Sequence, residues 1–182
     1  MEEKIFHCNL WNTIRVDKLA LSIINTWAFQ RLHYIKQTGV LYKVFPTATH
    51  TRFQHSLGVY HVTRKLLKKL EENNQNLGLT ERQKQLLCIA GLVHDIGHGP
   101  FSHLYDEYLK QNEGHCENTN PCSSKLPLTH EERSCEILKY LIDTPHPLTN
   151  EKIEINMEEY EFICECICKP RHEKWYHYIV NN

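Results

Sequence analysis

The chain has 182 residues, of which 41% are hydrophobic, and this is enough for one domain with one substantial core. Its formal net charge is −1 and its sequence pI is near 6.9, so no global basic field indicates nucleic acid as a partner. The N-terminal region carries no secretory signal, and no run of about 18 apolar residues could span a bilayer. We therefore expect an intracellular protein of the cytoplasm or nucleus, with no membrane partner.

Cysteine and histidine are the unusual residue types. The 8 cysteines are, in a reducing compartment, free thiols or metal ligands more often than disulfides. The 13 histidines gather into short segments. Histidine is the commonest metal ligand and titrates near neutral pH, so a metal site is the first functional hypothesis.

The first half of the chain predicts two helices joined by a loop. Asp17 suits the N-cap of a helix from residue 17 to about 37, along which Leu19, Ile23 and Trp27 recur at helical spacing. Residues 39–52 carry glycine, proline and several threonines, and they predict a loop. A second helix is expected from about Arg52 to a polar break at 73–78.

The second half predicts further helices and no convincing strand. Thr80 opens a helix that reaches His94-Asp95 and ends around 97–100, and Ser102 is expected to cap a short helix to about residue 111. Residues 112–128 predict a flexible insert. The remaining segments predict a helix over about 129–142, a break at 145–147, and one or two helices within 151–182.

The pattern as a whole predicts an all-α fold. We expect one domain over residues 1–182, with a metal-binding core at about 30–134. No internal repeat is visible along the chain.

His94 and Asp95 carry the chemistry of this core. Neighbouring helical residues lie about 100° apart, so two such side chains can converge on one ion beside a helix. An imidazole nitrogen and a carboxylate oxygen suit Mn, Fe, Zn, or Mg with waters. His98 is four residues after His94 and is expected to share its helical face.

A lone His-Asp pair is a weak signal, because a surface pair or a satisfied core histidine is the commoner explanation. Here the pair lies in an otherwise apolar segment, residues 89–103, that also holds His98 and His103. Polar groups in an apolar helix need partners, and one metal ion would satisfy several of them. The segment therefore favours a metal site.

Longer blocks of sequence resemble a known family. Residues 29–37, 44–58 and 89–106, together with Thr129-His130-Glu131, resemble the HD superfamily, and within it the deoxynucleoside triphosphate triphosphohydrolases. The resemblance includes the group that pairs a SAM domain with an HD domain in animals. The resemblance covers most of residues 4–134 and implies the N-terminal part of an HD-domain helical bundle.

The resemblance implies a divalent metal cofactor, whose identity the sequence does not determine, and a role for each matching residue. His55, His94 and Asp95 correspond to three of the four metal ligands of the family. His98 and His130 correspond to a pair that acts near the phosphate and the attacking water, and His103 and Asp106 to groups close to the scissile phosphate. Arg52 corresponds to a phosphate-contacting arginine and Gln37 to a sugar-contacting glutamine.

The implied activity is hydrolysis of a deoxynucleoside triphosphate to the deoxynucleoside and triphosphate. Phosphoryl-type transfer depends on positive groups and positioning, which histidines and an arginine supply. The chain has no Gly-rich loop followed by Lys-Ser/Thr, so it is not a P-loop NTPase. The partner implied is a nucleotide, and homo-oligomerisation is left open.

The chain departs from the family at the fourth metal ligand, an aspartate on a later helix. The only aspartates here are Asp17, Asp95, Asp106 and Asp143. Three interpretations follow. The chain is a fragment whose family core continues beyond residue 182, or a short form with a substitute ligand such as Glu158, Glu161 or His172, or a decayed copy without turnover.

Other departures concern specificity. Thr38 stands where the family has a larger apolar residue that helps to exclude the ribose 2′-hydroxyl. Asn25 and His33 stand where the animal enzymes bind a guanine-nucleotide activator with an aspartate and an arginine. Neither ribonucleotide discrimination nor activator binding is therefore carried over.

Two alternative hypotheses stay open beside the triphosphohydrolase. One is hydrolysis of another nucleotide phosphoester, and the other is an inactive module that binds a nucleotide or a protein partner. A second, less favoured metal site could use Cys116, Cys122, Cys164, Cys166 and Cys168, with His115. Its spacing lacks the C-x₂-C pair that is typical of structural zinc.

Overall fold

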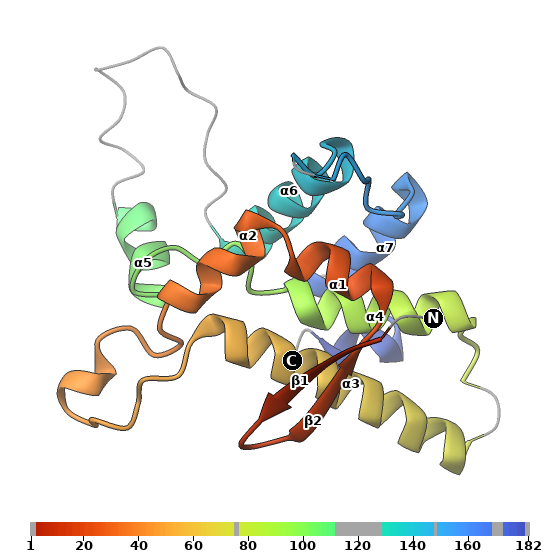
Figure 1. Ribbon diagram of the computed structural model, residues 1–182, viewed down its shortest axis with the longest axis horizontal. Coiled ribbons are helices and arrows are strands. Elements are labelled where there is room, and N and C mark those ends of the chain that lie inside the picture. Colours follow the sequence, from red (N-terminus) through yellow and green to blue (C-terminus); the bar gives the residue numbers. More distant parts are fainter. Residues whose placement is uncertain (1–2, 75–76, 112–128, 148, 169–172, 181–182) are drawn as a thin grey trace.

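The computed structural model describes residues 3–74, 77–111, 129–147, 149–168 and 173–180 (Figure 1). The all-α fold class is confirmed, with one small antiparallel hairpin added. The elements in chain order are β1 Lys4–Cys8, β2 Asn12–Val16, α1 Lys18–Ile24, α2 Trp27–Gln30, α3 Arg52–Asn73, α4 Glu81–Val93, α5 His103–Gln111, α6 His130–Asp143 and α7 Met157–Ile167, with 3₁₀ turns η1 Arg31–Tyr34, η2 Leu41–Lys43 and η3 Trp175–Ile179.

The long helices begin where side chains cap them. At each N-cap the side chain accepts a hydrogen bond from the backbone N–H three residues on, and the side chain of the Gln or Glu at that position accepts one from the N-cap N–H. The N-cap residues are Thr51, Thr80, Thr129 and Asn156. Such a capping box satisfies two N–H groups that the first turn leaves without partners. The predicted starts near 52, 80 and 129 are therefore correct to within a residue.

The prediction of one continuous helix over residues 17–37 is wrong, because two helices and a 3₁₀ turn occupy this range. Asp17 does cap its start, but α1 ends at Ile24 and Thr26 then caps a separate helix, α2. The Thr26 hydroxyl donates to the Ile23 carbonyl (2.7 Å) and accepts from the Phe29 N–H (3.3 Å). The turn buries Phe29 and leaves Trp27 exposed, so Trp27 does not lie on the apolar face that its spacing indicated.

The hairpin was missed because its alternation is short. Lys4 pairs with Val16 and Cys8 with Asn12 across the two strands. Along β2, Thr13 and Arg15 are exposed and alternate with the buried Ile14 and Val16. This period-2 pattern covers only four residues. Asn12 turns the chain in the left-handed region (φ 58°), which asparagine tolerates better than most residues.

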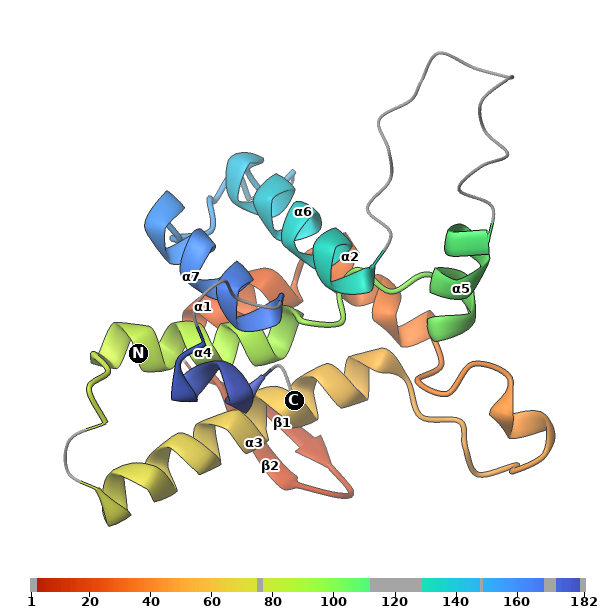
Figure 2. The same cartoon turned by 180° about the vertical axis from the view of Figure 1, so that it is seen from behind.

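Helix α4 is the central element. Every residue from Leu86 to Val93 is buried, and a helix that is apolar on all sides needs neighbours on all sides. Helices α3 and α7 both pack against it, as the two opposite views show (Figures 1 and 2). Its C-terminal end therefore places His94 and Asp95 inside the molecule, beside the first turns of α3. No helix among the described residues is both long and apolar enough to cross a membrane.

The pairing of α4 with α7 includes one well-made ion pair. Both Arg82 Nε and a terminal nitrogen donate to the Glu159 carboxylate (2.6 and 2.9 Å), and Arg82 also donates to the Glu154 carbonyl (2.7 Å). Bidentate arginine–carboxylate pairs are stronger than ordinary surface pairs. The hydrogen bond from Arg82 lowers the pKa of Glu159.

We predict that Arg82→Gln lowers the free energy of unfolding by about 1 kcal/mol. Because pairing with Arg82 lowers the pKa of Glu159, the ion pair stabilises the fold at neutral pH. This stabilisation is lost as the pH falls through the lowered pKa of Glu159 and the carboxylate becomes protonated. Urea unfolding at neutral and acid pH measures this. Lys69→Gln, which removes an exposed Lys69–Glu72 pair, is the control and should change stability by less than about 0.5 kcal/mol. An equal loss at both pH values would contradict the assigned cause.

Candidate metal centre

The Asp95 carboxylate is the centre of the site. It is buried, and its two oxygens face different partners. Oδ2 lies 2.6 Å from an Arg52 guanidinium nitrogen, 3.2 Å from His55 Nε2 and 3.3 Å from His94 Nε2. Oδ1 lies 3.3 Å from His98 Nε2 and 3.9 Å from His130 Nε2. One buried charge thus holds together side chains from α3, the end of α4 and α6.

The Oδ2 side has the donor spacing of a metal site. His55 Nε2 and His94 Nε2 are 3.3 Å apart, so with Asp95 Oδ2 they form a nearly equilateral triangle. Donors placed tetrahedrally at about 2.0–2.1 Å from an ion lie about 3.3 Å from one another. His94 Nδ1 is 2.8 Å from the Gly91 carbonyl, and an N–H donated there leaves the Nε2 lone pair for an ion. The donor set therefore fits a divalent cation.

His98 reaches the site by a route other than the predicted one. Helix α4 ends at Val93 with His94 as its C-cap, so His98 does not share a helical face with His94. The chain turns instead, with the His98 N–H donating to the Asp95 carbonyl (3.1 Å). Arg31 from η1 holds this turn by donating to the His98 carbonyl (2.7 Å) and to the Ile96 carbonyl.

Gly97 allows α6 to approach this turn. A Cβ at Gly97 would lie 2.2 Å from the His130 carbonyl oxygen and 2.5 Å from the Ser134 nitrogen. The Ser134 hydroxyl accepts from the Gly97 N–H (2.8 Å) and lies 2.7 Å from the His94 carbonyl, to which it can donate. This close contact brings the first turn of α6, and with it His130, close to Asp95.

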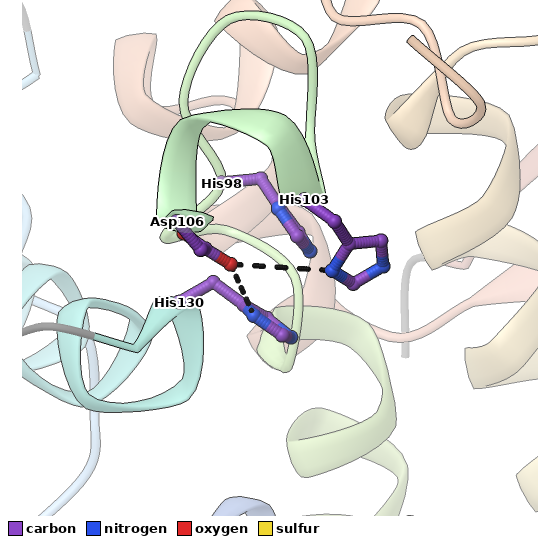
Figure 3. Close-up of side chains that lie close together, drawn as sticks. All are labelled: His98, His103, Asp106 and His130. Carbon is purple, nitrogen blue, oxygen red and sulfur yellow. Dashed lines mark hydrogen bonds and ion pairs between the residues drawn. The ribbon is translucent and has the colours of Figure 1, made fainter. Parts of the chain in front are cut away.

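A second cluster lies on the Oδ1 side of Asp95. The potential ligand atoms of His98, His103, Asp106 and His130 all lie within 4.8 Å of one another (Figure 3). The rings of His98 and His130 stack with centroids 3.9 Å apart. Asp106 Oδ2 lies 3.0 Å from His130 Nδ1 and 4.0 Å from His103 Nδ1, and Arg133 pairs with its other oxygen. His130 therefore has Nδ1 beside the Asp106 carboxylate, while Nε2 lies 3.3 Å from Glu131 Oε1 and 3.9 Å from Asp95 Oδ1.

The protonation of this centre follows from burial and pairing. Burial lowers the pKa of His98 to about 4, although Asp95 acts in the opposite direction. Burial also disfavours a charged His94, but its hydrogen bond and attraction to Asp95 outweigh this and raise its pKa. For Asp106, burial alone would raise the pKa, whereas pairing with Arg133 and His130 lowers it. His98 is thus neutral at pH 7 and Asp106 is ionised.

Arg52 and Gln37 lie next to the Oδ2 side. The Arg52 guanidinium, 2% exposed as a residue, donates to Asp95, to the Ser102 hydroxyl (3.1 Å) and to the Gln37 carbonyl (3.2 Å). The Gln37 side-chain oxygen is buried and has no hydrogen-bond partner among the described residues. Ser102 does not cap α5 as predicted, because its hydroxyl donates to the Lys36 carbonyl (2.7 Å) and accepts from Arg52.

The other expected ligands lie elsewhere. Glu158 and Glu161 on α7 are exposed and belong to neither His/Asp cluster of the described residues. His172 lies outside those residues, as do His115, Cys116, Cys122 and the whole expected insert at 112–128. Cys164 and Cys168 contact Cys135, a residue that the sequence hypothesis did not include.

Three site residues were missed from sequence, namely Arg31, Arg133 and Ser134. Arg133 and Ser134 follow His130 by three and four positions, so they share its face of α6. That spacing could have indicated them once His130 was singled out. Arg31 acts through backbone carbonyls, for which no sequence pattern exists.

Comparison with known proteins assigns the family. The sequence profile of the HD domain matches residues 52–145, which span more than half of the chain. The match contains His55, His94, Asp95 and His130, the side chains that converge here. The chain belongs to the HD-domain family. Its helical fold and its clustered histidines and aspartates agree with that membership.

This HD-domain chain is similar to longer proteins. A putative HD domain-containing protein of Acanthamoeba polyphaga mimivirus is 37% identical over 193 residues, which cover 98% of this chain and 39% of the relative. The deoxynucleoside triphosphate triphosphohydrolase SAMHD1 of Gallus gallus is 40% identical over 163 residues, 89% of this chain and 24% of the relative. The Dictyostelium discoideum homologue of SAMHD1 is 34% identical, covering 98% of this chain and 32% of the relative. The chain thus spans between about a quarter and two fifths of these relatives.

We predict that Gly97→Ala separates α6 from the turn after α4 and lowers the free energy of unfolding by about 1–3 kcal/mol. The added methyl group meets backbone atoms, which cannot move aside as a flexible side chain can. Gly58→Ala is the matched control, because the atoms nearest to its Cβ belong to the Trp11 side chain (Nε1 at 3.0 Å) and not to backbone. Thermal unfolding of both variants checks this. Equal effects would show that the approach of α6 at Gly97 is not tight.

Proposed function

We propose that this HD-domain chain is a metal-dependent phosphohydrolase that acts on a deoxynucleoside triphosphate and releases triphosphate. The observation that carries the proposal is the triangle of His55 Nε2, His94 Nε2 and Asp95 Oδ2, with sides of 3.2–3.3 Å. The names of the SAMHD1 relatives support the choice of substrate.

His55, His94 and Asp95 would hold the cation. When bound, a divalent ion supplies Lewis-acid polarisation of a phosphate and activation of water. Asp95 Oδ2 already accepts from Arg52, and its remaining lone pair suits the ion. The neighbouring Arg52 charge also balances the carboxylate. We expect weak metal binding, because three protein donors leave several coordination positions to water or substrate.

His130 would transfer the proton. Its Nδ1 lies 3.0 Å from Asp106, and that contact orients the ring and favours a proton on Nδ1. Its Nε2 lies 3.9 Å from Asp95 Oδ1 and 3.3 Å from the Glu131 carboxylate, and this nitrogen would accept and return the proton. His98, neutral and buried, stacks on His130 and fixes its plane.

The substrate groups would lie between the two clusters. His103 is exposed at the edge of the second cluster, where it can reach a phosphate oxygen. The buried Gln37 side-chain oxygen has an unused acceptor, which suits a sugar hydroxyl. Thr38 next to it is small, so we expect weak discrimination between deoxyribose and ribose.

The first test separates metal binding from turnover. His94→Ala and Asp95→Ala should remove both bound Mn²⁺ and hydrolysis, because each deletes a donor atom. His130→Ala should keep the metal and lower turnover by a factor of about 100 or more, the range typical of general acid–base groups. Metal content by mass spectrometry and triphosphate release from a panel of nucleotides provide the two readouts.

His7→Ala, in the exposed part of the hairpin, is the control and should change neither readout. Loss of metal in His130→Ala would show that His130 is a ligand. Metal binding without release from any triphosphate would favour the non-catalytic module, and release of inorganic phosphate from monophosphates alone would favour another phosphoester.

A further inference from the structure

Three cysteine thiols meet where α6 contacts α7, and none of them belongs to the two histidine clusters. Cys135 lies on α6 and is 8% exposed, and its Sγ is 3.6 Å from Cys168 Sγ. Cys164, one turn earlier on α7, is also within hydrogen-bonding range of Cys135. Both views place α6 beside α7 (Figures 1 and 2). None of the three is used by the proposed hydrolysis.

The hydrogen bonding makes the three thiols unequal. The bonds to Cys164 and Cys168 raise the pKa of Cys135, which therefore stays a thiol and acts as the donor. Hydrogen bonds with Cys135 lower the pKa of both Cys168 and Cys164, and both of these residues are partly exposed. A low pKa together with access to solvent is what makes a cysteine reactive toward disulfides. Cys168 and Cys164 are thus both suited to react first, and Cys135 to resolve.

Cys168 is better placed than Cys164 to bond with Cys135. It is the C-cap of α7 and has extended backbone angles, whereas Cys164 lies within the helix. Closing the 3.6 Å contact to a disulfide of about 2.05 Å needs the two sulfurs to approach by about 1.5 Å, and a residue at a helix end is less constrained in such a shift than one inside the helix.

We propose that Cys135 and Cys168 form a reversible disulfide with glutathione disulfide as the oxidant. Cys168 loses its proton to solvent, and its thiolate attacks one sulfur of glutathione disulfide. This forms a mixed disulfide and releases one glutathione thiolate, which takes up a proton from solvent. The Cys135 sulfur then attacks the Cys168 sulfur, the second glutathione leaves, and the Cys135 proton goes to it. The two protein sulfurs lose two electrons in total, and glutathione disulfide is reduced to two glutathione thiols.

The bond would fix α6 against the end of α7. Cys135 directly follows Ser134, whose hydroxyl contacts the Gly97 N–H and the His94 carbonyl. A cross-link over 33 positions also restricts the unfolded chain, so the oxidised form should be the more stable one.

The test is linkage mapping on the full chain. The protein is equilibrated in glutathione buffers of increasing oxidised fraction, alkylated, digested and analysed by mass spectrometry. We expect the Cys135–Cys168 cross-link to exceed Cys135–Cys164 by about tenfold and to disappear on adding reduced glutathione. The oxidised protein should also unfold at a higher temperature than the reduced protein.

Two cysteine variants, compared with the disulfide map of the wild-type protein, test which cysteine bonds with Cys135. Cys168→Ser should abolish the cross-link, and Cys166→Ser, which changes a buried thiol on the same helix, should leave it unchanged. A wild-type map with Cys164 as the main partner, or with only glutathione adducts, would overturn the proposal. Neither readout involves hydrolysis, so the result is independent of the proposed function.

Discussion

The structure around the site depends on one buried carboxylate. Asp95 is 2% exposed, and an ionised group at that depth is costly unless charges and hydrogen bonds surround it. Arg52 supplies a full positive charge from α3, and imidazoles from three segments complete the shell. Asp95 therefore links α3, α4 and α6 electrostatically as well as sterically. Its surroundings hold the pKa of Asp95 well below its usual range, although burial alone would raise it.

The two oxygens of Asp95 divide the centre into two functions. The Oδ2 side gathers two imidazole nitrogens at metal-ligand spacing, whereas the Oδ1 side faces the His98–His130 stack and Asp106. The proposed ion and the proposed proton-transfer group thus contact the same carboxylate from opposite sides. This arrangement requires α6 to lie against Gly97, where any larger residue would collide with backbone.

Local signals predicted the helices well and their connections poorly. Thr80 and Thr129 indicated helix starts because capping depends on neighbours three residues away. The break at Thr26 was not predicted, since a threonine fits a helix interior and a cap alike. The hairpin was missed because its alternation covers only four residues, and the burial of Ile14 and Val16 depends on a core formed by distant segments.

For the site, the family resemblance identified side chains that lie close together in the structure. Spacing alone predicted that His98 shares a helical face with His94, which is wrong because α4 ends at Val93. Residues that act through the backbone, such as Arg31, or that meet only after folding, such as Cys135, carry no local pattern. Ser102 illustrates the same limit, because its hydroxyl serves Arg52 and Lys36 instead of the helix that follows it.

The most direct test of the account is the position of a bound ion. Crystals grown with Mn²⁺ and measured near the manganese absorption edge would locate it by anomalous scattering. We expect one peak at about 2.0–2.3 Å from His55 Nε2, His94 Nε2 and Asp95 Oδ2 together. A peak held only by His98, His103, Asp106 and His130, or no peak at saturating Mn²⁺, would contradict the central claim.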